Sequence, residues 1–92
     1  MNNYTVKPHL ERIIGQKYFI IPVSEEMPDM GHTLLLNITA REILELLEQN
    51  FSIVEILNIL SNKYSMEEEA LINDVNIVVE NLIKSGIIEV NA

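Results

Sequence analysis

Two hydrophobic periodicities divide the chain into a strand-rich first part and a helical remainder. Short runs of β-branched and aromatic residues, separated by turn-forming residues, predict strands over residues 9–14, 17–23 and 33–36. Gly15-Gln16 is predicted to close a hairpin between the first two strands, because glycine accepts a positive φ. Beyond residue 39 the apolar residues recur at i, i+3, i+4 and i+7, which is typical of amphipathic helices.

This helical periodicity predicts three helices, over residues 40–49, over residues 53–63 and from about residue 66 to a C′ glycine at Gly86. Residues 87–90 can add a last strand. A Ser or Thr with a Glu three residues later predicts a capping box at each helix start. The three pairs, thirteen residues apart, are Thr39 with Glu42, Ser52 with Glu55 and Ser65 with Glu68.

The predicted elements define the expected fold. We expect one α+β domain over residues 1–92, winged helix-turn-helix-like, with an N-terminal three-stranded antiparallel sheet followed by three helices. With 92 residues the chain builds only a small core.

The charge of the chain is strongly uneven. Residues 1–24 carry three cations and one acid, whereas residues 25–92 carry thirteen acids and three cations. The whole chain has a net charge of −8. An acidic helical half repels phosphate backbones, so we do not expect a nucleic-acid partner.

The sequence offers little catalytic or metal-binding chemistry. It has no cysteine and no glycine-rich phosphate loop, and its two histidines, His9 and His32, lie in different segments without a second ligand at strand or helix spacing. We therefore expect no catalytic residue, no metal and no cofactor, and a protein that is not an enzyme. No signal peptide and no membrane-spanning run is apparent, which predicts a cytoplasmic protein.

The run Thr33-Leu34-Leu35-Leu36 breaks the alternation expected of a half-exposed strand. Either the strand is buried on both faces or contacts another copy, or it has an open edge that can accept an added peptide strand. The helix from residue 66 has a wide apolar stripe that is ambiguous in the same way: a core face or one wall of a groove.

At these residues the chain resembles the PqqD-like family. The segment Leu36-Asn37-Ile38-Thr39, followed by Ile43 and Leu46-Leu47, is similar to the leucine-asparagine-x-threonine signature of that family. Further matches are Ser52 with Glu55-Ile56, and Leu82 with Gly86-Ile87. The resemblance covers residues 9–90. It departs at Glu48-Gln49-Asn50, where the family often has Asp-Gly, although Asn50 can adopt the left-handed conformation that the turn needs.

The resemblance implies a RiPP recognition element, which binds the leader segment of a ribosomally made precursor peptide as an extra strand. The peptide would lie between the third strand and the third helix and be presented to a maturation enzyme. The implied partners are the leader and an enzyme such as a leader peptidase, with a lasso-peptide pathway favoured; the open edge can also form a homodimer. The implied contact residues are Thr33, Leu34, Leu35, Leu36, Ile72, Val75, Asn76 and Val79.

Two other functions fit a small helical chain. A winged-helix DNA-binding regulator needs cations on its recognition helix, whereas the last helix here carries mostly acids and only Lys84. An acyl or peptidyl carrier needs an attachment serine in an Asp-Ser-Leu-like context. Ser52 and Ser65 open predicted helices, but their neighbours differ from that context.

Overall fold

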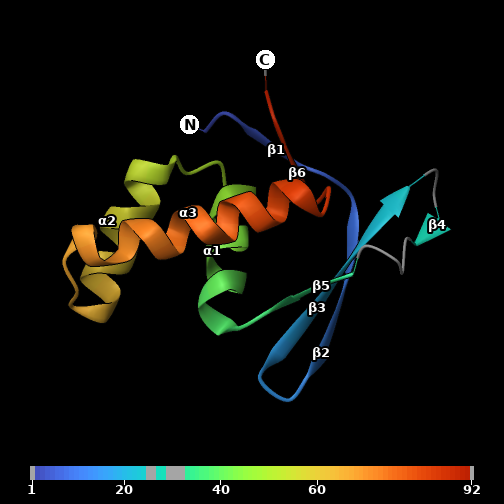
Figure 1. The fold of residues 1–92 in the computed structure, drawn as a ribbon, viewed down its shortest axis with the longest axis horizontal. Coiled ribbons are helices and arrows are strands. Elements are labelled where there is room, and N and C mark those ends of the chain that lie inside the picture. Colours follow the sequence, from blue (N-terminus) through green and yellow to red (C-terminus); the bar gives the residue numbers. More distant parts are fainter. Residues whose placement is uncertain (1, 25–26, 29–32, 92) are drawn as a thin grey trace.

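The computed structural model describes residues 2–24, 27–28 and 33–91. Six strands and three helices are formed by these residues, with most strands preceding the helices (Figure 1). The α+β class and the order of sheet and helices are confirmed. The helices fill one half of the molecule, and the long hairpin extends from the other half.

The main sheet is built around β3, Lys17–Ser24, which pairs along one edge with β2, His9–Ile14. The predicted turn joins them, with Gly15 at a φ of +63°. The other edge of β3 pairs with β5, Leu34–Leu36, and with the short β4, Met27–Pro28. The sheet thus contains one short strand beyond the three that the sequence predicts.

A second, two-stranded sheet joins the chain ends. The strand β1, Tyr4–Val6, pairs antiparallel with β6, Ile88–Val90, so that the two termini lie close together (Figure 1). The last strand agrees with the sequence, but β1 was not expected. Its three residues are too few for a periodic pattern, and only its distant partner makes it a strand.

The register of the main sheet fixes which groups of β5 face outward. Val23 donates its backbone N–H to the carbonyl of Pro8, so odd-numbered residues of β3 direct their hydrogen-bonding groups toward β2. Even-numbered residues therefore bond to β5, where Tyr18 opposes Leu36 and Ile20 opposes Leu34. It follows that the N–H and C=O of Leu35 point away from β3, at the outer edge of β5. Among the described residues, β5 pairs with no other strand.

The three helices bury a single core against the inner face of the sheet. They are α1, Ile38–Glu48, α2, Ile53–Tyr64, and α3, Glu68–Lys84. The core contains Ile20 and Leu36 from the sheet together with the apolar stripe of each helix. None of the three helices in the described part combines the length and apolar character that crossing a membrane requires.

Only one of the three predicted capping boxes is present. Ser52 and Glu55 form it at the start of α2, with both reciprocal hydrogen bonds. At α1 the prediction that Thr39 is the N-cap is wrong. The helix begins before Thr39, and its N-cap is Asn37, whose Oδ1 accepts the N–H of Ala40 at 2.8 Å.

The third predicted cap is also wrong. Ser65 ends α2 in the left-handed conformation, with a φ of +53°, rather than starting the next helix. The helix α3 begins at Glu68, and its N-cap Glu67 makes no side-chain cap bond. The predictions of left-handed Asn50 and of C′ Gly86 are confirmed by φ values of +68° and +75°.

Charged side chains of α1 tie the helix to its neighbours. Arg41 donates to both carboxylate oxygens of Glu11 on β2, at 2.7 and 3.0 Å, and this hydrogen bonding raises the pKa of Arg41. Glu42 accepts from Lys63 at 2.7 Å and from the Tyr64 hydroxyl. Burial favours the neutral form of Glu42, but these hydrogen bonds outweigh burial and lower its pKa.

The left-handed conformation of Ser65 yields a stability prediction. A residue with a side chain is strained there by about 1 kcal/mol, whereas glycine is not. Ser65→Gly should therefore raise the free energy of unfolding in urea by up to about 1 kcal/mol. Ser85→Gly is the matched control, because Ser85 caps α3 with a φ of −84° and should gain nothing. A loss of stability in Ser65→Gly would mean that Ser65 acts as an N-cap after all.

The register predicts the amide exchange rates along β5. The N–H groups of Leu34 and Leu36 bond to β3 and should exchange slowly with deuterium, whereas that of Leu35 points outward and should exchange much faster. Residue-resolved hydrogen exchange by NMR measures this directly. Equal protection at all three positions in the free protein would contradict the outward orientation of Leu35.

The lowered pKa of Glu42 predicts a contribution to acid sensitivity. Because the folded state favours the carboxylate, the Glu42 contacts stabilise the fold above the usual glutamate pKa and are lost as pH falls through the lowered value. Glu42→Gln should therefore lose less stability than wild type between neutral and acidic pH in urea titrations. Glu80→Gln, at an exposed position of α3, is the matched control and should keep the wild-type slope. Identical slopes in wild type and Glu42→Gln would refute the assignment.

Candidate functional site

The sequence-predicted strand residues lie on both faces of β5. Leu36 is buried in the core and Leu34 packs against it from the same face. Leu35 opposes Phe19 on the outer face and is 50% exposed. Thr33 precedes the strand and is exposed. The unusual run of leucines is therefore neither fully buried nor fully exposed: two side chains belong to the core and one does not.

The predicted residues of α3 divide into a buried pair and an exposed pair. Val75 and Val79 are only 1% and 5% exposed, and they belong to the core stripe of the helix. Ile72 and Asn76 are exposed. The buried valines hold α3 in place from within, so their side chains are not available to a ligand in this conformation.

A pocket of about 370 Å³ lies between the start of α1 and the middle of α3. Its position is set by the junction where β5 ends at Leu36 and α1 begins. Apolar walls and a polar rim line it: Asn37, Thr39, Ala40, Ile43, Asp74, Ile77 and Val78. We call it the junction pocket.

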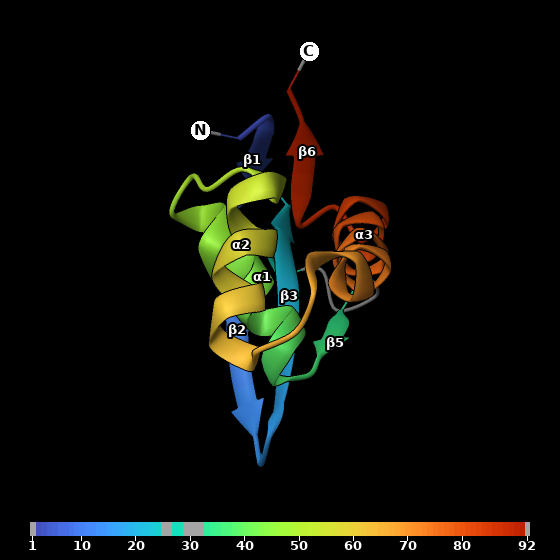
Figure 2. The same ribbon diagram turned by 90° about the vertical axis from the view of Figure 1, so that its left-hand side faces the viewer.

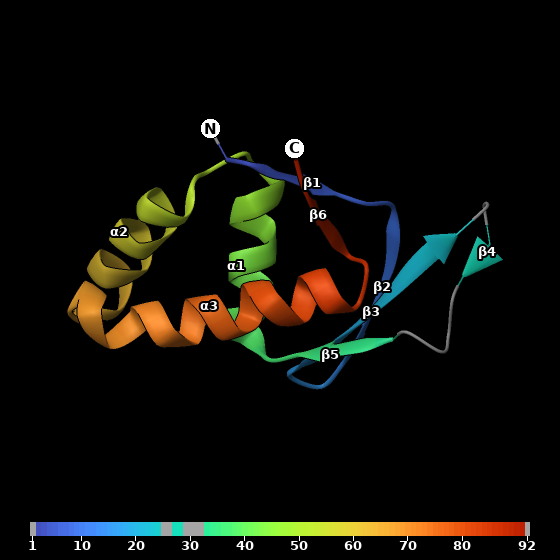
Figure 3. The same cartoon turned by 45° about the horizontal axis from the view of Figure 1, so that its top comes forward.

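The junction pocket identifies the flank of α3 that faces the start of α1, where β5 ends. Successive helix residues are rotated by about 100°, so Asp74 and Val78, each one residue before a buried valine, lie on one side of the buried stripe. Ile72 and Asn76 lie on the other side. Figure 2, which looks along α3, and Figure 3 place the helix beside β5. The flank with Asp74 and Val78 lines the pocket, and Ile72 and Asn76 do not.

The helix α3 packs chiefly against elements other than β5. Its main neighbours are α2, α1 and β6. The junction pocket, with Asp74, Ile77 and Val78 of α3 on one side, therefore lies just beyond the end of β5, and the outward edge of β5 leads away from it. Such an arrangement offers backbone hydrogen-bonding groups on one side and apolar side chains on the other.

Asp74 gives this region a negative charge. It is exposed, and within the described part of the chain it makes no ion pair or side-chain hydrogen bond. The nearest cation on the same helix is Lys84, ten residues further on and thus about 15 Å along the axis. No internal partner on α3 neutralises the carboxylate.

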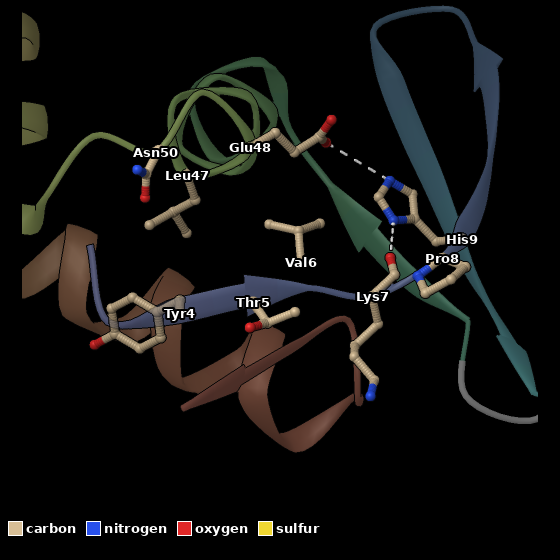
Figure 4. A pocket seen from close by; sticks show the side chains of 9 residues that line it. All are labelled: Tyr4, Thr5, Val6, Lys7, Pro8, His9, Leu47, Glu48 and Asn50. Atoms are coloured by element: carbon tan, nitrogen blue, oxygen red, sulfur yellow. Dashed lines mark hydrogen bonds and ion pairs between the residues drawn. The ribbon is translucent and has the colours of Figure 1, made fainter. Parts of the chain in front are cut away.

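Another pocket lies elsewhere, between β1 and the end of α1, and has a volume of about 720 Å³ (Figure 4). The Nδ1 of His9 lies 2.8 Å from the carbonyl oxygen of Lys7, and its Nε2 is 3.7 Å from a carboxylate oxygen of Glu48. His32 lies outside the described residues. No group of three His, Cys, Asp or Glu that could hold a metal occurs among the residues described.

The sequence did not identify Asp74, Ile77 and Val78 as site residues. All sit on the helix that was predicted to form one wall, but the hydrophobic stripe is wide and does not reveal which flank meets the strand. An acid three and four residues before the apolar Ile77 and Val78 was the available signal. It could be distinguished from an ordinary solvated charge only once α1 and β5 were placed in space.

Comparison with known proteins gives one family match. The model of the family described as coenzyme PQQ synthesis protein D (PqqD) matches residues 22–88, from the end of β3 to the start of β6. Neither the curated proteins nor the solved structures give a match, and the likeness to winged-helix domains stays a prediction. The matched residues include α1 and α3, which line the junction pocket, and β5, which ends beside it. The chain therefore belongs to the PqqD family.

Proposed function

We propose that this protein binds the leader segment of a ribosomally made precursor peptide as an added strand on the outer edge of β5. Membership of the PqqD family implies a peptide-binding partner in the biosynthesis of such modified peptides. The observation that carries the proposal is the outward orientation of Leu35, whose N–H and C=O face away from β3 beside an uncovered flank of α3.

Strand addition uses the outward edge of β5 and the neighbouring flank of α3. The backbone of the added strand bonds to the outward groups of Leu35, which supports affinity without regard to sequence. Side chains of a strand alternate between its two faces. One set then points inward, over Leu34 and Leu36 toward α3, and the other lies beside Leu35 on the outer face. Specificity comes from the inward set.

The proposed contact residues differ in part from those implied by the family resemblance. Thr33, Leu34, Leu35 and Leu36 remain the strand that receives the peptide. On α3 we replace Ile72 and Asn76 by the flank that lines the junction pocket, Asp74, Ile77 and Val78. Val75 and Val79 support this flank from the core instead of touching the peptide.

We propose that the partner of the leader-bound protein is a maturation enzyme. The protein acts as a non-catalytic recognition subunit in the cytoplasm and presents the bound leader to a maturation enzyme, for which a leader peptidase of a lasso-peptide pathway is our choice. DNA binding is not proposed, because α3 carries the unpaired Asp74 and the acids Glu68 and Glu69 in its first turn.

The proposal is tested by calorimetric and NMR titration of the protein with synthetic leaders of short precursors encoded beside it. We expect a complex of micromolar affinity in which the Leu35 amide shifts and becomes protected from exchange. Ile77→Glu should weaken binding roughly five- to tenfold, because it places a charge in an apolar wall. The matched control is Ile72→Glu, on the other flank of α3 and 45% exposed, which should bind like wild type.

Two results would contradict the proposal. One is the absence of both heat and shift changes with every such leader. The other is binding that leaves the Leu35 amide unchanged and is weakened by Ile72→Glu but not by Ile77→Glu, since the peptide would then lie on the other flank of α3. Thermal unfolding of each variant separates a binding defect from a folding defect.

A further inference from the structure

We infer that the junction pocket selects a lysine or arginine of the bound peptide, which pairs with Asp74. This inference rests on the proposed function, because it assigns the chemical class of one peptide side chain at the same site. The junction pocket would determine which peptides are preferred, whereas the outward edge of β5 supplies backbone hydrogen bonds that support affinity for any sequence.

The lining of the junction pocket suits a long side chain with an apolar stem and a polar end. Ala40, Ile43 and Val78 supply apolar walls, and the rim carries one charge, that of Asp74. The Oδ1 of Asn37 already accepts the N–H of Ala40 as the cap of α1. Lysine and arginine lay their methylene stems on apolar surface while the charged head stays at a polar rim, which is the arrangement this pocket offers.

The cations of the described helices are already committed elsewhere or are distant. Arg41 pairs with Glu11, and Lys63 pairs with Glu42. Lys84 lies at the far end of α3. None of these helix cations pairs with Asp74, so its carboxylate is available to a cation brought by a ligand.

Other side chains fit the pocket less well. A neutral apolar side chain would cover the walls and remove water from the Asp74 carboxylate without supplying a partner, which costs free energy. An acidic side chain would be repelled by Asp74 and by the net charge of −8. A cationic side chain covers the apolar walls with its methylene stem and pairs its charged head with the Asp74 carboxylate.

The location of the pocket also fixes the position of this residue in the peptide. Asn37 and Thr39 follow directly after the last residue of β5, so the cation lies at the end of the added strand nearest the start of α1. The other inward side chains, two and four residues along, meet Leu36 and Leu34 and should be apolar. The expected recognition pattern is thus a terminal cation with apolar residues at alternate positions.

The probe for this inference is a phage library of random 12-residue peptides, selected against the intact chain. Peptides that shift the Leu35 amide should carry Lys or Arg at one fixed position relative to the apolar alternation. Their affinity should fall at least about fivefold when that residue becomes norleucine, or when the protein carries Asp74→Asn. Selection against Asp74→Lys should instead enrich Asp or Glu at the same position.

Glu80→Gln is the matched control, because it removes one negative charge from an exposed position of α3 outside the junction pocket. It should leave affinity within about twofold of wild type, as expected for a screened surface charge. An equal loss in Asp74→Asn and Glu80→Gln would overturn the inference, since only the net charge would then matter.

The failures of the two proposals are distinguishable. Selected peptides that shift the Leu35 amide but show no preferred cation would overturn the selectivity of the pocket and leave strand addition intact. Selected peptides that never shift the Leu35 amide would overturn strand addition and the pocket inference with it. The norleucine substitution uses the wild-type protein, so the test does not depend on the folding of any variant.

Discussion

The candidate site depends on how α3 is anchored. Its buried stripe, Leu71, Val75, Val79 and Leu82, packs into the core with α1 and α2, and its C-terminal end is held by β6. Asp74 and Ile77 lie outside this buried stripe and are exposed. The same packing that stabilises the fold therefore fixes which flank of α3 is available beside the start of α1 and the end of β5.

Much of the fold follows from local sequence signals. Gly15, Asn50 and Gly86 adopt the positive φ values that their positions demand, and the capping box at Ser52 forms as predicted. The signals at Thr39 and Ser65 failed because each had a local competitor. Asn37, two residues earlier, supplies a cap oxygen of its own, and the left-handed turn at Ser65 delays the next helix by two residues.

The strand of the site could be predicted from the sequence, whereas the helix face could not. The leucine run marked β5, and only one of its side chains, Leu35, is exposed on the outer face. On α3, apolar residues lie on both flanks of the buried valines, with Ile72 on one side and Ile77 and Val78 on the other. The helical period locates the buried stripe but does not say which flank meets β5, because that depends on the placement of α1 and α3 relative to the sheet.

The acidity of the chain bears on how an open strand edge is managed. An unpaired edge invites pairing with a second copy. Here such pairing would bring together two regions that each carry an unneutralised Asp74 within an acidic helical half. Like charges at that approach oppose the dimer, while a peptide that brings a cation to the same edge reduces the repulsion. In the proposed function, the acidic charge thus favours a foreign strand that carries a cation over a copy of β5.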